Sequence, residues 1–191
     1  MTKYELYLAV HLGTAAVWIG AGFLQVLLGA RATLARDPAR AIAYAHDSEW
    51  LGLRLFLPAN LVVAAFGFLL AAEGWDYDQL WIQLGLAGFT LSFLTGSAVF
   101  GPGWTKIGKL AASDGVDSPV VHARIRRLVT IAFFDLGVLL AVLFEMTVKP
   151  TADDQGALAV TAAIPAAFAV LGILLNRFAQ ARSPEAALES A

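Results

Sequence analysis

Five long runs of apolar residues, separated by short charged segments, account for most of the chain. A hydrocarbon layer about 30 Å thick requires roughly 20 apolar residues of helix to cross it. Each run is close to that length, and none shows the apolar–polar alternation of a membrane barrel strand. Backbone groups in lipid must pair within their own segment, so each run is expected to be a helix. The predicted spans lie at about 6–29, 54–72, 80–100, 128–148 and 156–176.

The composition agrees with lipid as the solvent of this chain. Hydrophobic residues make up 59% of the sequence and charged residues 15%, against about 25% charged residues in a typical soluble domain. The expected fold class is therefore all-α, a polytopic transmembrane helical bundle that forms a single membrane domain. A core at about 4–150 is expected to hold four helices around its polar residues, with the fifth packed at the edge and a flexible tail at 177–191.

Lysine and arginine fall almost entirely in alternate loops. The segments 31–54, 106–127 and 177–182 carry eleven of them, whereas the opposite set of loops carries Lys3 and Lys149. Loops rich in lysine and arginine stay in the cytoplasm. The N-terminus is therefore predicted outside and the C-terminus inside, in the inner (plasma) membrane of a bacterial cell.

Prolines predict where helices begin and bend. Asp37 and Ser118 each precede a proline, which predicts capped helices that start at about 38 and 119 and run on toward spans 2 and 4. Pro58 and Pro165 are expected to kink spans 2 and 5. The glycine–proline–glycine sequence at 101–103 is expected to end span 3, with a short interfacial helix after it.

Several polar and ionisable side chains fall inside the predicted spans. Such groups are costly in lipid and are functional candidates by default. The rise of 1.5 Å per residue sorts them by depth into two layers. The outer layer contains His11, Glu145 and Gln83. The inner layer contains Asp135, Asn60 and Gln25, with Arg54 or Arg31 reaching toward it.

The inner layer has a structural and a functional interpretation. Asp135 is expected to pair with Arg54 and to accept a hydrogen bond from Asn60, which would join spans 2 and 4, while Gln25 ties in span 1. The alternative is a relay for protons or cations through Asp135.

His11 is the candidate ligand of the outer layer. Neutral imidazole is the commonest metal ligand and a standard axial ligand of haem. Small residues and Trp18 share its helix face, which leaves room for a flat group or a close helix. Either the ring is buried and bonded to Glu145 or to backbone, or it binds haem or a metal with Glu145 or Gln83 orienting it, or it handles protons.

Other chemistries are excluded by what the sequence lacks. The chain has no cysteine, which excludes disulfides and thiolate sites. A net charge of -2 without a basic, aromatic-interleaved stretch argues against nucleic acid as a partner. No catalytic triad, phosphate-binding glycine loop or HExxH pair is present, so an ordinary hydrolase or nucleotide-driven enzyme is not expected.

Three segments carry a resemblance to a known family. They are HLGTAAVWIG at 11–20, SEWLG running into RLFLP at 48–58, and the stretch from Asp135 through EMTVKP at 145–150. They resemble a bacterial family of predicted integral membrane proteins of unknown function, over about residues 4–150. The resemblance implies a polytopic cell-membrane protein and supplies no activity.

A weaker similarity concerns the first span. His11 followed after six residues by Trp18, with Pro58 and Gly67 in the second span, is similar to the copper-resistance D membrane domain and to the membrane-bound, haem-associated type of protoporphyrinogen oxidase. That similarity implies His11 as a ligand of haem or copper.

Three hypotheses on function follow. The first is a small accessory or structural membrane protein, as a homo-oligomer or as a subunit of a complex, in which the polar layers join helices. The second is a haem- or copper-associated protein, which requires His11 to face the bundle interior. The third is a proton-coupled transporter, which requires Asp135 and Glu145 to line one continuous cavity.

Overall fold

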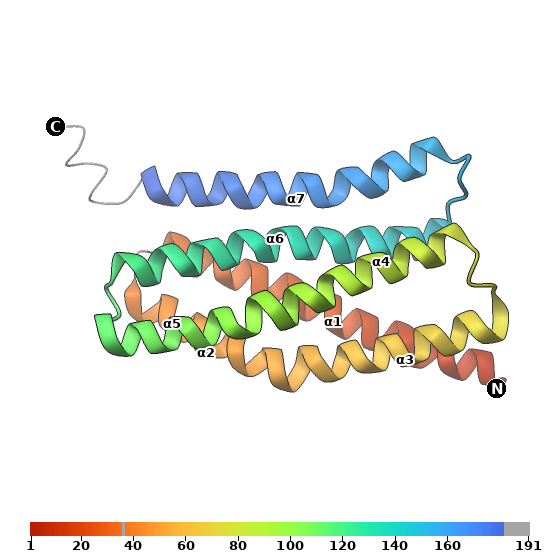
Figure 1. The fold of residues 1–191 in the computed structure, drawn as a ribbon, viewed down its shortest axis with the longest axis horizontal. Helices are drawn as coiled ribbons and strands as arrows, with labels where there is room; N and C mark the ends of the chain where they lie inside the picture. Colours follow the sequence, from red (N-terminus) through yellow and green to blue (C-terminus); the bar gives the residue numbers. More distant parts are fainter. Residues whose placement is uncertain (36, 182–191) are drawn as a thin grey trace.

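The computed structural model describes residues 1–35 and 37–181, and this part of the chain is helical with short connections. Five long helical stretches run along an elongated bundle (Figure 1). The second stretch comprises α2, a π-helical segment η1, and α3. The third comprises α4, a π-helical segment η2, and α5. The bounds are α1 Lys3–Leu34, α2 Pro38–Leu51, η1 Gly52–Phe56, α3 Leu57–Gly74, α4 Leu80–Leu94, η2 Thr95–Phe100, α5 Gly101–Asp114, α6 Pro119–Val148 and α7 Gln155–Ala181.

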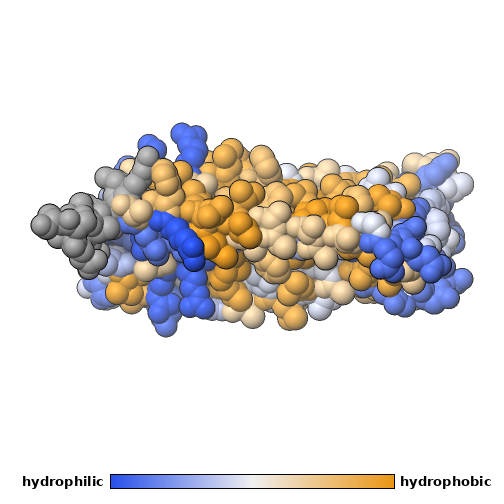
Figure 2. All heavy atoms as spheres, turned by 90° about the horizontal axis from the view of Figure 1, so that it is seen from above, coloured by the Kyte–Doolittle hydropathy of each residue, from blue (hydrophilic) through white to orange (hydrophobic). Residues whose placement is uncertain are grey.

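The five predicted spans are confirmed, since each lies in a helix long and apolar enough to cross a membrane. Large apolar residues such as Phe23 and Leu174 project outward, and each is more than half exposed. Figure 2 shows an apolar band between two polar ends. The predicted tail begins too early, because α7 continues to Ala181. Residues 182–191 and Arg36 lie outside the described part of the chain.

The two ends of the bundle differ in charge. We call one the basic end; it holds the α1–α2 and α5–α6 connections and the end of α7 (Figure 1). The other, the acidic end, holds the N-terminus, the end of α3, and the α3–α4 and α6–α7 loops (Figure 1). Its acids are Glu73 at the end of α3 and, in the loops, Asp76, Asp78, Asp153 and Asp154. Which end faces the cytoplasm stays a prediction.

Local sequence explains where the helices begin. Thr2 and Glu5 form a reciprocal capping box at the start of α1. The Asp37 carboxylate accepts hydrogen bonds from two backbone N–H groups at the start of α2, as predicted. α6 starts at Pro119 as expected, but the Ser118 side chain makes no capping hydrogen bond.

Each of the two π-helical segments ends two residues before a proline. The N–H of Leu57 bonds the carbonyl of Gly52, and the N–H of Gly101 bonds the carbonyl of Gly96, five residues back in each case. The expectation that 101–103 would end span 3 is wrong, because the helix continues through Pro102 to Asp114. Proline clashes with the carbonyl four residues before it in a regular α-helix. The wider π turn relieves that clash and lets the helix go on.

α6 is the centre of the bundle. It packs against α7, α4 and α1, while α7 packs mainly on α6, at the edge as expected (Figure 1). Glycine makes the α6–α7 contact close, since a side-chain carbon on Gly137 would lie 2.8 Å from the Cα of Pro165. By contrast, α3 packs on α1 and scarcely contacts α4, its neighbour in sequence.

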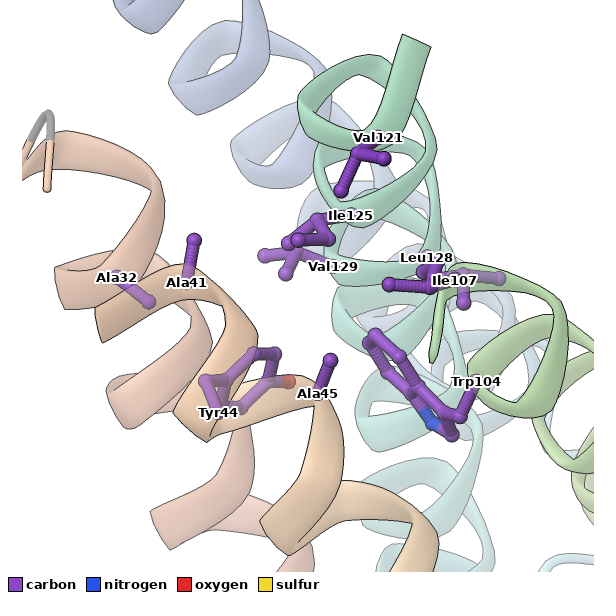
Figure 3. Packing of buried hydrophobic residues seen from close by; sticks show 10 residues of the cluster. All are labelled: Ala32, Ala41, Tyr44, Ala45, Trp104, Ile107, Val121, Ile125, Leu128 and Val129. Atoms are coloured by element: carbon purple, nitrogen blue, oxygen red, sulfur yellow. The ribbon is translucent and has the colours of Figure 1, made fainter. Parts of the chain in front are cut away.

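The best-buried apolar cluster lies near the basic end, where α2 and α5 meet α1 and α6. Figure 3 shows its side chains converging from these four helices. Tyr44 and Trp104 pack edge to face with ring centroids 5.5 Å apart, and Ile107 and Val121 are fully buried. This cluster fixes α2 and α5 against the spans and closes one end of the cavity described next.

Candidate functional site

Two cavities follow one another along the bundle axis. The basic-end cavity has a volume of about 440 Å³ and is lined by α1–α6 with η1 and η2. The acidic-end cavity has a volume of about 210 Å³ and lies among α1, α3, α4 and α6. Trp18 and Leu139 line both cavities and therefore separate them.

An apolar layer forms this partition. Trp18 is 6% exposed and packs edge to face on Phe89, with ring centroids 5.9 Å apart. Leu139, Ala59 and Val63 complete the cluster. Trp18 was expected beside His11 as part of a cofactor site; it lines the acidic-end cavity together with His11 and also belongs to this layer.

Polar side chains are part of the lining of the basic-end cavity, and four of them come from four different helices. Gln25 comes from α1, Asn60 from α3, Ser92 from α4 and Asp135 from α6. The Ser92 hydroxyl donates a hydrogen bond of 3.1 Å to Oδ2 of Asp135. The inner layer predicted from sequence thus meets at one cavity, with Ser92 as a member that was not expected.

Three oxygens in this cavity have no hydrogen-bond partner within the described chain. They are Oε1 of Gln25, Oδ1 of Asn60 and Oδ1 of Asp135. Asn60 uses its Nδ2 to donate a 2.7 Å bond to the Phe56 carbonyl, so its oxygen stays available. Buried polar atoms are nearly always paired, and each exception calls for an explanation such as bound water or a ligand.

Arg54 does not join this cluster, and the expected ion pair with Asp135 is wrong. Its guanidinium lies 5.2 Å from the ring centroid of Trp50, and the side chain is exposed. Arg31 is exposed as well. A long cation near a helix end can reach the aqueous boundary and avoid the desolvation penalty of a buried pair.

The basic-end cavity opens sideways between η1 and η2. Leu53 and Leu57 on one side and Gly96, Ser97 and Gly101 on the other line it and are themselves exposed. α3 and α4 scarcely contact each other, so they do not close this window. Its exposed rim includes Leu53 and Leu57, which belong to the apolar surface. Each side of the window is a π-helical segment.

His11 faces the bundle interior and lines the acidic-end cavity. Its Nδ1 lies 3.0 Å from the Val63 carbonyl of α3. A carbonyl only accepts hydrogen bonds, so Nδ1 carries the proton and Nε2 keeps its lone pair. Gly67 makes room for the ring, since a side-chain carbon there would lie 3.2 Å from Cε1 of His11. The backbone-bonded interpretation of this histidine is therefore the one that the geometry matches.

Gln83 and Glu145 do not orient His11, contrary to expectation. Gln83 is exposed and donates to the Tyr77 carbonyl at 3.3 Å. Glu145 is 3% exposed, lines neither cavity, and has the Thr161 hydroxyl of α7 as its neighbour. Its position on the α7 side of α6 also means that Asp135 and Glu145 do not share a continuous cavity.

Lys149 is a feature that the sequence did not single out. It ends α6 in the left-handed conformation, with φ of 54°. Its ammonium lies 3.9 Å from the ring centroid of Trp75 and 5.2 Å from that of Trp81. The Trp75 indole in turn donates to the Tyr4 hydroxyl at 3.5 Å. These residues line the mouth of the acidic-end cavity.

Comparisons with known proteins place the chain in a family without an assigned activity. No curated protein and no solved structure matches it. One family model, described as "Predicted integral membrane protein (DUF2269)", matches residues 5–150. The match includes every residue that lines the basic-end cavity and leaves α7 outside it. The chain therefore belongs to the DUF2269 family of predicted integral membrane proteins, whose function is unknown.

Proposed function

We propose that this protein is an accessory protein of the bacterial cell membrane that binds a small amphiphilic molecule in its basic-end cavity. The observation that supports this most directly is a cavity of about 440 Å³ in which three oxygens lack partners within the described chain. Small-ligand sites typically have volumes of about 300–1,000 Å³, apolar walls and a few polar groups. This cavity has that character, with Trp18, Phe56 and Trp104 among its walls.

The window between η1 and η2 gives the ligand access from lipid. Leu53 is 67% exposed and Leu57 41% exposed at its rim, so an apolar molecule can approach without crossing water. π-helical segments often occur at functional sites because they alter the local course of a helix. Here residues of both segments line the cavity that contains the polar cluster.

The orientation belongs to the proposal. We place the basic end in the cytoplasm, because it carries nearly all of the lysine and arginine. Because the chain has no cysteine, single-cysteine variants test this cleanly. A membrane-impermeant thiol reagent should label Ala152→Cys in intact cells and Ser113→Cys only after lysis. The reverse pattern would overturn the orientation.

The binding proposal is tested by native mass spectrometry of protein released from mild detergent. Wild type should carry a small amphiphile. Gly22→Leu should lose it, because Gly22 lines the cavity and has only the tips of Leu136 and Leu139 nearby, at 4.0 Å. Gly20→Leu is the matched control on α1, where the added side chain meets open space, and it should retain the ligand. Wild type without any bound amphiphile, or equal retention in both variants, would contradict the proposal.

The two other hypotheses on ligands fit less well. The acidic-end cavity of about 210 Å³ is below the usual range of ligand sites, and the described residues contain no group of three metal-ligating side chains. Haem or copper at His11 stays a prediction, which an absorption spectrum and metal analysis of wild type and His11→Ala would test. A proton-coupled transporter would have to use Asp135 without Glu145, because Glu145 lines neither cavity. An oligomer or a partner subunit also stays a prediction.

A further inference from the structure

We infer that the ligand of the basic-end cavity is a primary ammonium with an apolar body. This inference rests on the proposed function and names the chemical class that the cavity would take. It stands on the three unpaired oxygens of Gln25, Asn60 and Asp135 and on the charges of the residues around them.

The unpaired groups are acceptors, so the ligand must supply donors. The carboxylate of Asp135 can only accept when ionised, and Ser92 occupies just one of its two oxygens. The amide N–H₂ of Asn60 already donates to the Phe56 carbonyl, which fixes its oxygen as the free group. An ether, ester or ketone oxygen on a ligand would place acceptor against acceptor in this cavity.

The charges around the cavity call for a cation. Two acids, Asp135 and Glu49, line it, and the described lining contains no lysine, arginine or histidine. This is notable because the cavity lies at the basic end of the molecule. Glu49 accepts a 2.6 Å hydrogen bond from Thr105 near the mouth, while Arg54 lies outside over Trp50. A buried carboxylate without a counter-ion is unfavourable, and a cationic ligand would supply that counter-ion.

A primary ammonium matches the number and kind of the free groups. It carries three N–H donors and one positive charge, as the lysine side chain does. In the proposed complex, those donors would go to the three unpaired oxygens, which lie on three helices, with a charge-assisted bond to Asp135. The aromatic walls formed by Trp18, Phe56 and Trp104 suit the apolar body and attract a cation to their faces. A quaternary ammonium has the charge without any donor, and an alcohol has one donor without the charge.

Three probes of equal chain length separate these features: n-octylamine, octyltrimethylammonium and 1-octanol. Binding to protein in lipid nanodiscs is followed by tryptophan fluorescence, since Trp18 and Trp104 line the cavity. Empty nanodiscs and the Gly22→Leu variant correct for partition into lipid. Octylamine at neutral pH should bind at least about tenfold more tightly than either other probe, because a charge-assisted hydrogen bond is worth about that factor.

A variant of Asp135 and a matched control test whether the ammonium group of the probe contacts this residue. Asp135→Asn should weaken octylamine binding about tenfold or more and leave 1-octanol binding nearly unchanged. Asp114→Asn is the matched control, since it removes an exposed carboxylate at the same end of the bundle. The comparison of probes in wild type needs no variant, so the test holds even where Asp135→Asn fails to fold.

The outcomes are distinguishable. If 1-octanol or octyltrimethylammonium binds as tightly as octylamine, or if the co-purified molecule has no amino group, the inference is wrong and the binding cavity stands. If no probe binds and wild type carries no amphiphile, the proposed function fails as well.

Discussion

The two cavities use the same helices and differ in how their polar groups are satisfied. In the acidic-end cavity, His11 bonds the Val63 carbonyl and the Lys149 ammonium lies on the Trp75 ring. In the basic-end cavity, Oδ1 of Asp135 and Oδ1 of Asn60 are buried without a hydrogen-bond partner in the described chain. A paired polar group joins helices, whereas an unpaired one costs stability until something binds it. The comparison supports the proposal that the first cavity is a structural seam between helices and the second a ligand site.

The largest effect is expected where α3 packs against the His11 ring. In Gly67→Leu the new side chain must displace the His11 ring, which a side-chain carbon would approach to 3.2 Å. Overpacking of this kind costs about 1–3 kcal/mol, so the apparent melting temperature in detergent should fall. Gly20→Leu, with open space around it, is the control. Equal melting temperatures for the two variants would show that the packing of Gly67 against His11 does not contribute to stability.

In the basic-end cavity we expect a substitution to raise the stability of the protein instead of lowering it. Asp135→Leu replaces an incompletely paired acid by an apolar side chain and frees only the Ser92 hydroxyl, which can bond its own helix. We expect ligand-free protein to be stabilised by about 1–2 kcal/mol, since an unsatisfied buried group costs that much. Thermal unfolding of protein stripped of ligand is the measurement. A large destabilisation would show that Asp135 is structural and that the two cavities are alike.

A smaller loss is expected at the mouth of the acidic-end cavity. Lys149→Met keeps the length of the side chain but removes the cation that lies on Trp75 and Trp81. Cation–π contacts contribute about 0.5–2 kcal/mol according to exposure. The apparent melting temperature should therefore fall slightly at low and high salt alike. Binding at the basic-end cavity should not change, and a change there would mean that the two cavities are coupled.

The smallest effect concerns the α6–α7 loop. The backbone N–H and the hydroxyl of Thr151 both bond the Asp154 carboxylate, which lowers its pKa from the ordinary value of 3.8. A lowered pKa means stabilisation that is present above the unfolded value and lost as the pH falls through the folded one. Thr151→Val should raise the pKa of Asp154 toward its ordinary value, as measured by carboxyl NMR titration. An unchanged pKa would mean that the hydroxyl contributes nothing.

Membrane insertion is what made the fold predictable from sequence. Hydropathy is a property of the linear chain, so five spans and the start of α2 at Pro38 follow from residue order alone. The continuation of span 3 through Pro102 was missed because a proline usually ends or kinks a helix, and the π turn that accommodates it has no sequence pattern of its own.

The site was predictable only in part. Depth along the helices grouped Gln25, Asn60 and Asp135 near one level, and in the structure these three residues line one cavity. Depth does not give the direction in which a side chain points around its helix. Arg54 and Glu145 lie at suitable depths but point to the surface and to α7, respectively.

The layer at Trp18 has a consequence for the response to membrane voltage. A cation that reaches Asp135 through the window stays on the basic-end side of Trp18 and Leu139. It crosses only part of the membrane field, so its binding should depend weakly on voltage. A cation that moved past Trp18 would also cross the remaining part of the membrane potential. A full crossing is worth about 2.3 kcal/mol per unit charge per 100 mV. The voltage dependence of occupancy thus distinguishes a protein that holds a cation from one that carries it across.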